Sequence, residues 1–252
     1  MTKLSKQQKR NKKKNIAGKA RITKKLVKKR EENLAKNILK YGKSITRRQF
    51  DAYFYSRMPL VRFQAEEFEW YSFFENRLLG IIFRDVTDND YGFALMGRDS
   101  RKLFRWISGS NDFHNSIANA REDLALLIHR NYVDNLEDVY PQGDEAAPII
   151  DLFSDVVSED LQHHGYKMLA NEPRFEAGRN LINEIGNSFV DNDGHFEREF
   201  QSVNFNARLW EMYLHIYFHT EGLRLENNHA APDFELSYFD QKCFVEAVTV
   251  NP

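Results

Sequence analysis

Positive charge is concentrated at the start of this chain, and that distribution limits where a folded core can form. Residues 1–48 hold 19 Lys or Arg against two acids, a net charge of +17, whereas the rest of the 252-residue chain holds 17 bases and 35 acids, a net of −18. The basic segment has almost no aromatic residues, so it buries too little apolar surface to fold alone. We therefore expect a disordered or helical basic arm over residues 1–48, with the folded domains after it.

Two interpretations of this arm stay open. It can bind the backbone of nucleic acid, most simply DNA, because each neutralised phosphate releases counterions and adds affinity. It can instead be a solvated tail or helix that docks on the acidic remainder of its own chain. Both fit the three basic clusters, which are Lys12-Lys13-Lys14, Lys24-Lys25 and Lys28-Lys29-Arg30.

The overall composition is that of a globular protein. A hydrophobic fraction of 42%, with 20 Phe and 11 Tyr, can fill the cores of two modest domains. The sequence has no run of 18 apolar residues and no apolar stretch at the N-terminus that could serve as a signal peptide. The single Cys243 excludes an internal disulfide and any cysteine-rich zinc site. We expect a cytoplasmic protein without a membrane partner.

Residues 49–140 are expected to form an N-terminal α+β domain built on a small antiparallel meander with helices. Turn-forming residues separate three short strand-like runs. Before these runs, aromatic spacing up to about residue 72 indicates short helical pieces broken at Pro59. After them, an amphipathic helix is expected over residues 116–131. The three strand-like runs are 78–85, 91–97 and 102–107.

Residues 141–200 are expected to be a linker and helical connector. The stretch Tyr140–Pro148 is rich in helix-breaking residues and has no periodicity, which is typical of a linker. A helix is predicted over residues 175–189, ending near the tetrapeptide Asp191–Gly194. That tetrapeptide is similar to part of a calcium loop but lacks the later ligands, so a turn explains it better. The acids Asp88 and Asp90 are likewise explained as turn residues rather than as a cation site.

The last fifty residues carry the sequence pattern most suggestive of chemistry. A helix is predicted from Asn206, as N-cap, to Gly222, and Glu211, His215 and His219 form a polar stripe between apolar rows on it. Such a helix is expected to be buried, with the stripe facing a cleft or a polar partner. The same three residues could chelate zinc, although the HExxH order is absent.

Two strands follow this helix and place two more acids. Pro232 and Asp233 open an alternating strand that ends in a hairpin turn near residues 240–242. Residues 244–250 are almost wholly apolar, as expected of a central strand covered on both faces, and Glu246 interrupts them. A carboxylate in such a strand is costly unless a cation or a hydrogen-bond donor meets it.

This order of helix acid, Pro-Asp and strand acid resembles the PD-(D/E)xK, or restriction-endonuclease-like, nuclease superfamily over about one fifth of the chain. The resemblance implies an α/β half-core in residues 201–252 and catalytic roles for Glu211, Asp233 and Glu246. It also implies that Asp233 and Glu246 hold Mg²⁺ or Mn²⁺. The expected function is metal-dependent hydrolysis of phosphodiesters in DNA.

The sequence departs from the family pattern in two ways. The family lysine is replaced by Val248, and Lys242, the nearest lysine with the strand parity of Glu246, lies four residues away from it. The family core also continues beyond the elements found here, which suggests an incomplete core that a homodimer or another partner completes. Loss of one preorganised donor typically costs about 3 kcal/mol of transition-state stabilisation. The alternative function is therefore a catalytically inactive, nuclease-derived protein that binds nucleic acid or another partner.

Overall fold

The structure, a computed structural model, describes residues 25, 29, 38–53, 64–145, 150–189, 191, 194–226, 232–238 and 240–250. Most of the basic arm lies outside these residues. Its last part is folded: Ile38–Lys40 is the 3-10 helix η1, and Gly42–Ile45 is strand β1. Ile38 and Ile45 are both buried, which explains why a segment of basic composition joins a core.

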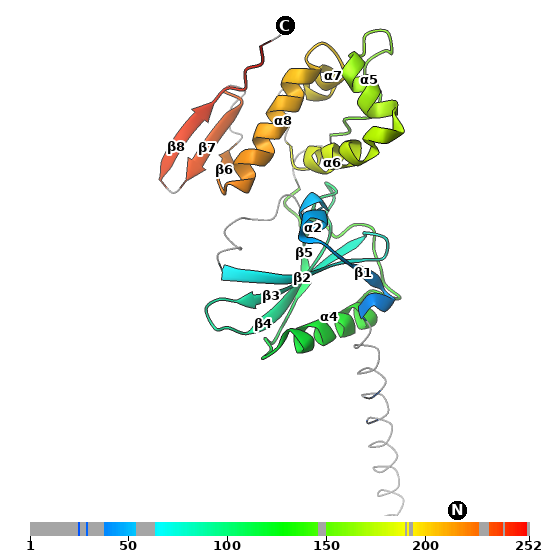
Figure 1. The fold of residues 1–252 in the computed structure, drawn as a ribbon, viewed down its shortest axis with the longest axis vertical. Coiled ribbons are helices and arrows are strands. Elements are labelled where there is room, and N and C mark those ends of the chain that lie inside the picture. The colour runs from blue at the N-terminus through cyan, green and yellow to red at the C-terminus, as the bar shows by residue number, and fades with distance from the viewer. Residues whose placement is uncertain are drawn as a thin grey trace, which may run out of the picture.

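The N-terminal part of the chain is a five-stranded antiparallel sheet in the order β1-β2-β3-β4-β5 (Figure 1). Helix α4, Ile117–Asn131, packs on one face, where Leu124 and Ile128 are fully buried. Helix α2, Arg47–Tyr53, covers the other face with Phe50. Apolar side chains on both faces therefore hold the sheet between helices. The remaining strands are β2, Ala65–Phe73; β3, Leu78–Asp85; β4, Tyr91–Arg98; and β5, Phe104–Gly109.

The predicted meander and the helix after it are confirmed. Strands β3, β4 and β5 pair in sequence, and Ser116 caps α4 because its hydroxyl accepts a hydrogen bond from the Asn119 N–H. The helical prediction before residue 72 is wrong over strand β2. The pairing register shifts between Glu67 and Glu69, and this bulge breaks the alternation by which a strand is recognised.

A helical layer follows the sheet domain. Its core is aromatic, and Tyr166, Phe196 and Phe200 are almost completely buried in it. The carboxylate of Asp191 accepts hydrogen bonds from the backbone N–H groups of Gly194, at 2.9 Å, and Phe196, at 3.1 Å, as the turn interpretation predicts, while residues 192 and 193 lie outside the described residues. The elements of the layer are α5, His164–Asn171; η2, Pro173–Phe175; α6, Glu176–Gly186; α7, Phe196–Gln201; and α8, Phe205–Thr220.

Helix α8 lies between the other helices and a small C-terminal sheet (Figure 1). Gly222, at φ +82°, ends α8 as predicted, and the Leu223 N–H donates to the Phe218 carbonyl at 3.0 Å. The sheet is antiparallel in the order β6-β7-β8 and packs its apolar side on Phe218 of α8. Its strands are β6, Arg224–Glu226; β7, Phe234–Tyr238; and β8, Gln241–Val245. The described chain is thus a mixed α+β structure.

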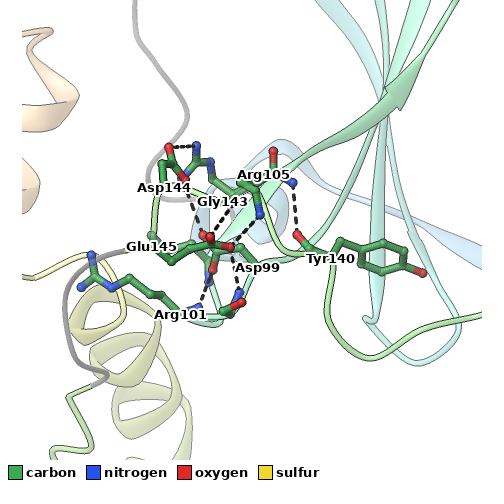
Figure 2. Close-up of polar contacts among 10 residues, drawn as sticks. Asp99, Arg101, Arg105, Tyr140, Gly143, Asp144 and Glu145 are labelled. Carbon is green, nitrogen blue, oxygen red and sulfur yellow. Dashed lines mark hydrogen bonds and ion pairs between the residues drawn. The ribbon is translucent and has the colours of Figure 1, made fainter.

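The predicted linker is anchored along its first six residues. The Tyr140 N–H donates to the Arg98 carbonyl at 2.7 Å, and the Gln142 N–H donates to the Glu145 carboxylate at 2.7 Å. The Gly143 N–H donates to the same carboxylate, also at 2.7 Å (Figure 2). These backbone donors, Gln142 first, lower the pKa of Glu145 to about 2. Residues 140–145 therefore form a strap across the turn between β4 and β5.

A partly buried ion pair joins the sheet domain to the helical layer. Arg98, at the end of β4, donates to Glu184 of α6 through both terminal nitrogens, at 2.6 and 3.1 Å. Arg101 Nη2 also donates to the Phe189 carbonyl at 3.1 Å. None of the helices in the described part of the chain has the length and hydropathy needed to span a bilayer.

Candidate metal site on the C-terminal sheet

The C-terminal sheet has one polar face. Phe234 and Leu236 of β7 turn toward α8, so Glu235 and Ser237, which alternate with them, lie on the opposite face. The pairing register places Glu226 of β6 beside Glu235 and Lys242 of β8 beside Ser237. Three strands therefore contribute to a single cluster of two carboxylates, a hydroxyl and an ammonium group.

The lysine of this cluster bridges both acids. Lys242 Nζ lies 2.5 Å from Glu235 Oε1 and 3.2 Å from Glu226 Oε2, and the Ser237 hydroxyl donates to Glu226 Oε1 at 3.1 Å. Hydrogen bonding to Lys242 is the main cause of a lowered pKa at Glu226. The same contacts, that with Glu235 first, raise the pKa of Lys242, so Glu226 and Lys242 are both charged at neutral pH.

One carboxylate oxygen of Glu235 has no hydrogen-bond donor among the described residues. Its side chain is 7% exposed, and its Oε2 is buried and accepts no hydrogen bond from any described residue. A buried carboxylate oxygen without a donor is costly. A hard cation is the kind of group that would satisfy such an oxygen.

Asp233 and Glu246 lie at the same end of this sheet. Asp233 directly precedes β7, and its Oδ2 accepts the Ala247 N–H at 2.7 Å. The register that pairs Phe234 with Val245, continued by one residue, places Asp233 opposite Glu246. Asp233 is partly buried and Glu246 is exposed. Two of the three predicted acids are thus neighbours, and both lie on the same face of the sheet as Glu235.

Glu211 lies in a different setting. It is buried on α8, and its Oε2 accepts a hydrogen bond from Arg208 Nη1 at 2.5 Å, while Arg208 also pairs with Glu199. Burial alone would lower the pKa of Arg208, but the two carboxylates raise it overall. The described residues contain no group of three or more His, Cys, Asp or Glu side chains arranged to hold a metal ion. The structure therefore does not bring Glu211 into one ligand group with Asp233 and Glu246.

The polar stripe of α8 faces inward rather than toward a cleft. His215 is buried, its Nε2 lies 3.2 Å from the Ser188 hydroxyl, and Phe189 packs edge-on to its ring. Burial first, and then the charge of His219, lowers the pKa of His215 to about 3. The stripe is thus a polar seam within the helical layer, and His215 is neutral at physiological pH.

The strand prediction for residues 244–250 needs correction. Strand β8 ends at Val245 and lies at the edge of the described sheet, so it is not a central strand covered on both faces. Phe244 is 58% exposed and Val248 is 75% exposed. The apolar composition matched a covered strand, but no described element packs on this side of β8.

Sequence reasoning missed Glu226 and Glu235 as candidate residues. A signal for Glu235 was present, because residues 233, 235 and 237 are polar and alternate with apolar Phe234 and Leu236. No local signal identifies Glu226, since only the pairing of β6 with β7 brings it to the cluster.

Comparison with known proteins adds no relative. No protein family model matches the sequence, and neither curated proteins nor solved structures include one that is significantly similar to it. Any functional conclusion must therefore be drawn from the geometry and the residues themselves.

Proposed function

We propose that this chain is a metal-dependent nuclease of restriction-endonuclease-like type that hydrolyses phosphodiesters in DNA. The observation that carries the proposal is the contact of Asp233 with residue 247, which draws Asp233 and Glu246 to the same end of the C-terminal sheet. Glu235, whose buried Oε2 has no hydrogen-bond partner among the described residues, lies two residues after Asp233 on the same face of the sheet. Carboxylate oxygens of this kind are the ligands that Mg²⁺ and Mn²⁺ prefer.

In this proposal Asp233 and Glu246 hold the cation, and Glu211 orients the metal shell or joins it through water. A bound divalent cation supplies charge neutralisation at the phosphate and a water of lowered pKa. Lys242 is the ammonium group nearest to the acids among the described residues of this sheet, and its salt bridges keep it protonated. A homodimer, or a partner that completes the core, and DNA bound by the basic arm belong to the same proposal.

Melting of the full chain with and without Mn²⁺ tests the proposal. Two carboxylates at one site repel each other without metal, so binding to the folded state should raise the melting temperature by mass action. Asp233→Asn and Glu246→Gln should each abolish that rise, and the matched turn variant Asp88→Asn should keep it. A metal response that never appears, or that survives loss of both acids, would leave the proposal without support.

The alternative function is a catalytically inactive, nuclease-derived protein that binds nucleic acid or another partner. The observation in its favour is charge compensation: Glu211 is paired with Arg208, and Lys242 with Glu235 and Glu226. DNA binding without Mg²⁺-dependent cleavage, over a range of single-stranded and duplex substrates, would favour this alternative.

A further inference from the structure

The solvent-facing side of helix α8 carries no charge. Five of its residues are exposed, and the central three are aromatic: Trp210, Tyr213 and Tyr217, with 39%, 56% and 48% of their surfaces exposed. The rings of Trp210 and Tyr213 stack, with centroids 5.2 Å apart and planes at 11°. Exposed helix faces of globular proteins are normally charged or polar, and clustered aromatic residues without charge are typical of an interface centre. The five residues, named the aromatic strip below, are Asn206, Trp210, Tyr213, Tyr217 and Thr220.

The aromatic strip forms one continuous line along α8. Its members are separated by four, three, four and three residues, the spacing that places residues on a single face of a helix, and a second helix can lie along such a line. Val203, 84% exposed, lies just before the helix and extends the apolar surface. A surface that stacks nucleobases normally combines its rings with a positively charged groove, and none of the five residues of the strip is charged.

The order of residues in the aromatic strip is nearly symmetric about Tyr213. Asn206 and Thr220 lie seven residues to either side, and Trp210 and Tyr217 lie three and four residues to either side. In an antiparallel pair of identical helices centred on Tyr213, polar ends therefore meet polar ends and aromatic rings meet aromatic rings. The absence of charge removes the like-charge repulsion that a two-fold contact of a charged strip with itself would create.

We propose that the aromatic strip is the contact surface of a homodimer, in which α8 packs antiparallel against α8 of a second copy with Tyr213 near the two-fold axis. Two helices of this length make a contact about 24 Å long. A contact of that size is below that of a large obligate interface, so the association is reversible. The inference does not depend on the proposed metal site, because the acids of that site lie on the C-terminal sheet and not on this strip.

Sedimentation equilibrium of the full chain and two variants tests the dimer. The wild type should show a monomer–dimer equilibrium. Tyr213→Glu places two carboxylates face to face at the axis, so it should raise the dissociation constant of the dimer at least about thirtyfold. Trp106→Glu replaces a tryptophan that is 62% exposed on β5 of the other domain, and it should leave the equilibrium unchanged. A wild type that stays monomeric at every concentration, or a dimer that Tyr213→Glu does not weaken, would overturn the proposal.

Cross-linking locates the axis independently of affinity. In a Cys243→Ser background, a short bismaleimide should couple two copies of the Tyr213→Cys variant but not two copies of the Trp106→Cys variant. Equal coupling of both variants would argue against a two-fold axis at Tyr213. If the wild type is monomeric and Tyr213→Glu instead abolishes binding of a fluorescent single-stranded oligonucleotide, the strip is a base-stacking surface and the dimer is refuted.

Discussion

The ammonium group of Lys242 lies 2.5 Å from Oε1 of Glu235, a carboxylate that is 7% exposed. The pair joins β7 to β8 on the polar face of the C-terminal sheet. When a buried carboxylate loses the lysine with which it is paired, it has to be rehydrated, protonated or met by another positive charge.

The first prediction concerns this pair. Lys242→Met should lower the melting temperature by several degrees because Glu235 is left buried without a counter-charge, and Lys242→Arg should lower it less. Adding Glu235→Gln to Lys242→Met should restore part of the loss. Thermal melts of the wild type, Lys242→Met, Glu235→Gln and the double variant form a double-mutant cycle. If Glu235→Gln gives no recovery, the interaction of the two side chains does not stabilise the sheet.

Local patterns were sufficient for the elements that obey one period throughout. Strands β3 and β4 are uninterrupted, and α4 follows a Ser116 cap that its first turn uses, so each could be predicted from its own residues. Strand β2 could not be predicted, because the bulge between Glu67 and Glu69 shifts its pairing register. For α8 the apolar rows predicted a buried helix correctly, and of the two settings expected for its polar stripe the structure shows polar partners: Arg208 of the same helix for Glu211, and Ser188 for His215.

The contacts of the candidate site also differ in whether the sequence can predict them. The approach of Asp233 to Glu246 follows from a hairpin whose register is set within fifteen residues of chain. The partner of Glu211, Arg208, lies three residues before it on the same helix, so that ion pair could have been predicted from spacing alone. Glu226 joins the cluster through the pairing of β6 with β7, and β6 has only three residues, too few to show a strand period from which the pairing could be predicted.

The second prediction concerns His215, whose pKa is lowered to about 3 from 6.5, mainly by burial. Below pH 6.5 His215 is protonated in the unfolded chain but stays neutral in the folded chain. Stability is therefore lost as the pH falls from 6.5 toward 3. Between pH 6.5 and 5 this group alone should account for about 2 kcal/mol. Denaturant unfolding at both pH values should show a smaller loss for His215→Gln than for the wild type. His164→Gln, at an exposed position, should behave like the wild type, and an equally shallow loss there would contradict the assignment to His215.

The third prediction concerns the replaced family lysine. Val248 is 75% exposed and has the strand parity of Glu246, so a lysine there can be accommodated and can lie beside the acids. If the proposed nuclease is active, Val248→Lys should raise Mg²⁺-dependent cleavage by about a hundredfold, because one transition-state donor is typically worth that much. Val248→Met, similar in length but uncharged, is the control. A wild type that cuts DNA faster than a normally folded Val248→Lys variant would show that the donor comes from elsewhere.

The fourth prediction concerns the basic arm. Deletion should stop at residue 37, because Ile38 and Ile45 are buried in the first domain. If residues 1–37 bind the DNA backbone, their removal should weaken binding to all sequences alike and flatten the dependence of affinity on salt. Replacing Lys12, Lys13 and Lys14 by Arg should keep the salt slope. An unchanged slope in the truncated protein would favour the interpretation in which the arm docks on its own chain.

The last prediction concerns the pair that joins the two parts of the fold, Arg98 and Glu184. Their side chains are only 24% and 17% exposed and make two hydrogen bonds, so Glu184→Gln should cost about 1–2 kcal/mol of unfolding free energy. The exposed pair of Arg105 with Asp144 is the matched comparison, and Asp144→Asn should cost well under 1 kcal/mol.

Because Arg98 ends β4 and Glu184 lies on α6, loss of the pair should also let the sheet domain and the helical layer unfold at different denaturant concentrations. Tryptophan emission from Trp106 and Trp210, each retained as the single remaining tryptophan in turn, would follow the two parts separately. Coincident transitions in Glu184→Gln, with a cost no greater than that of Asp144→Asn, would mean that packing rather than this ion pair couples the two cores.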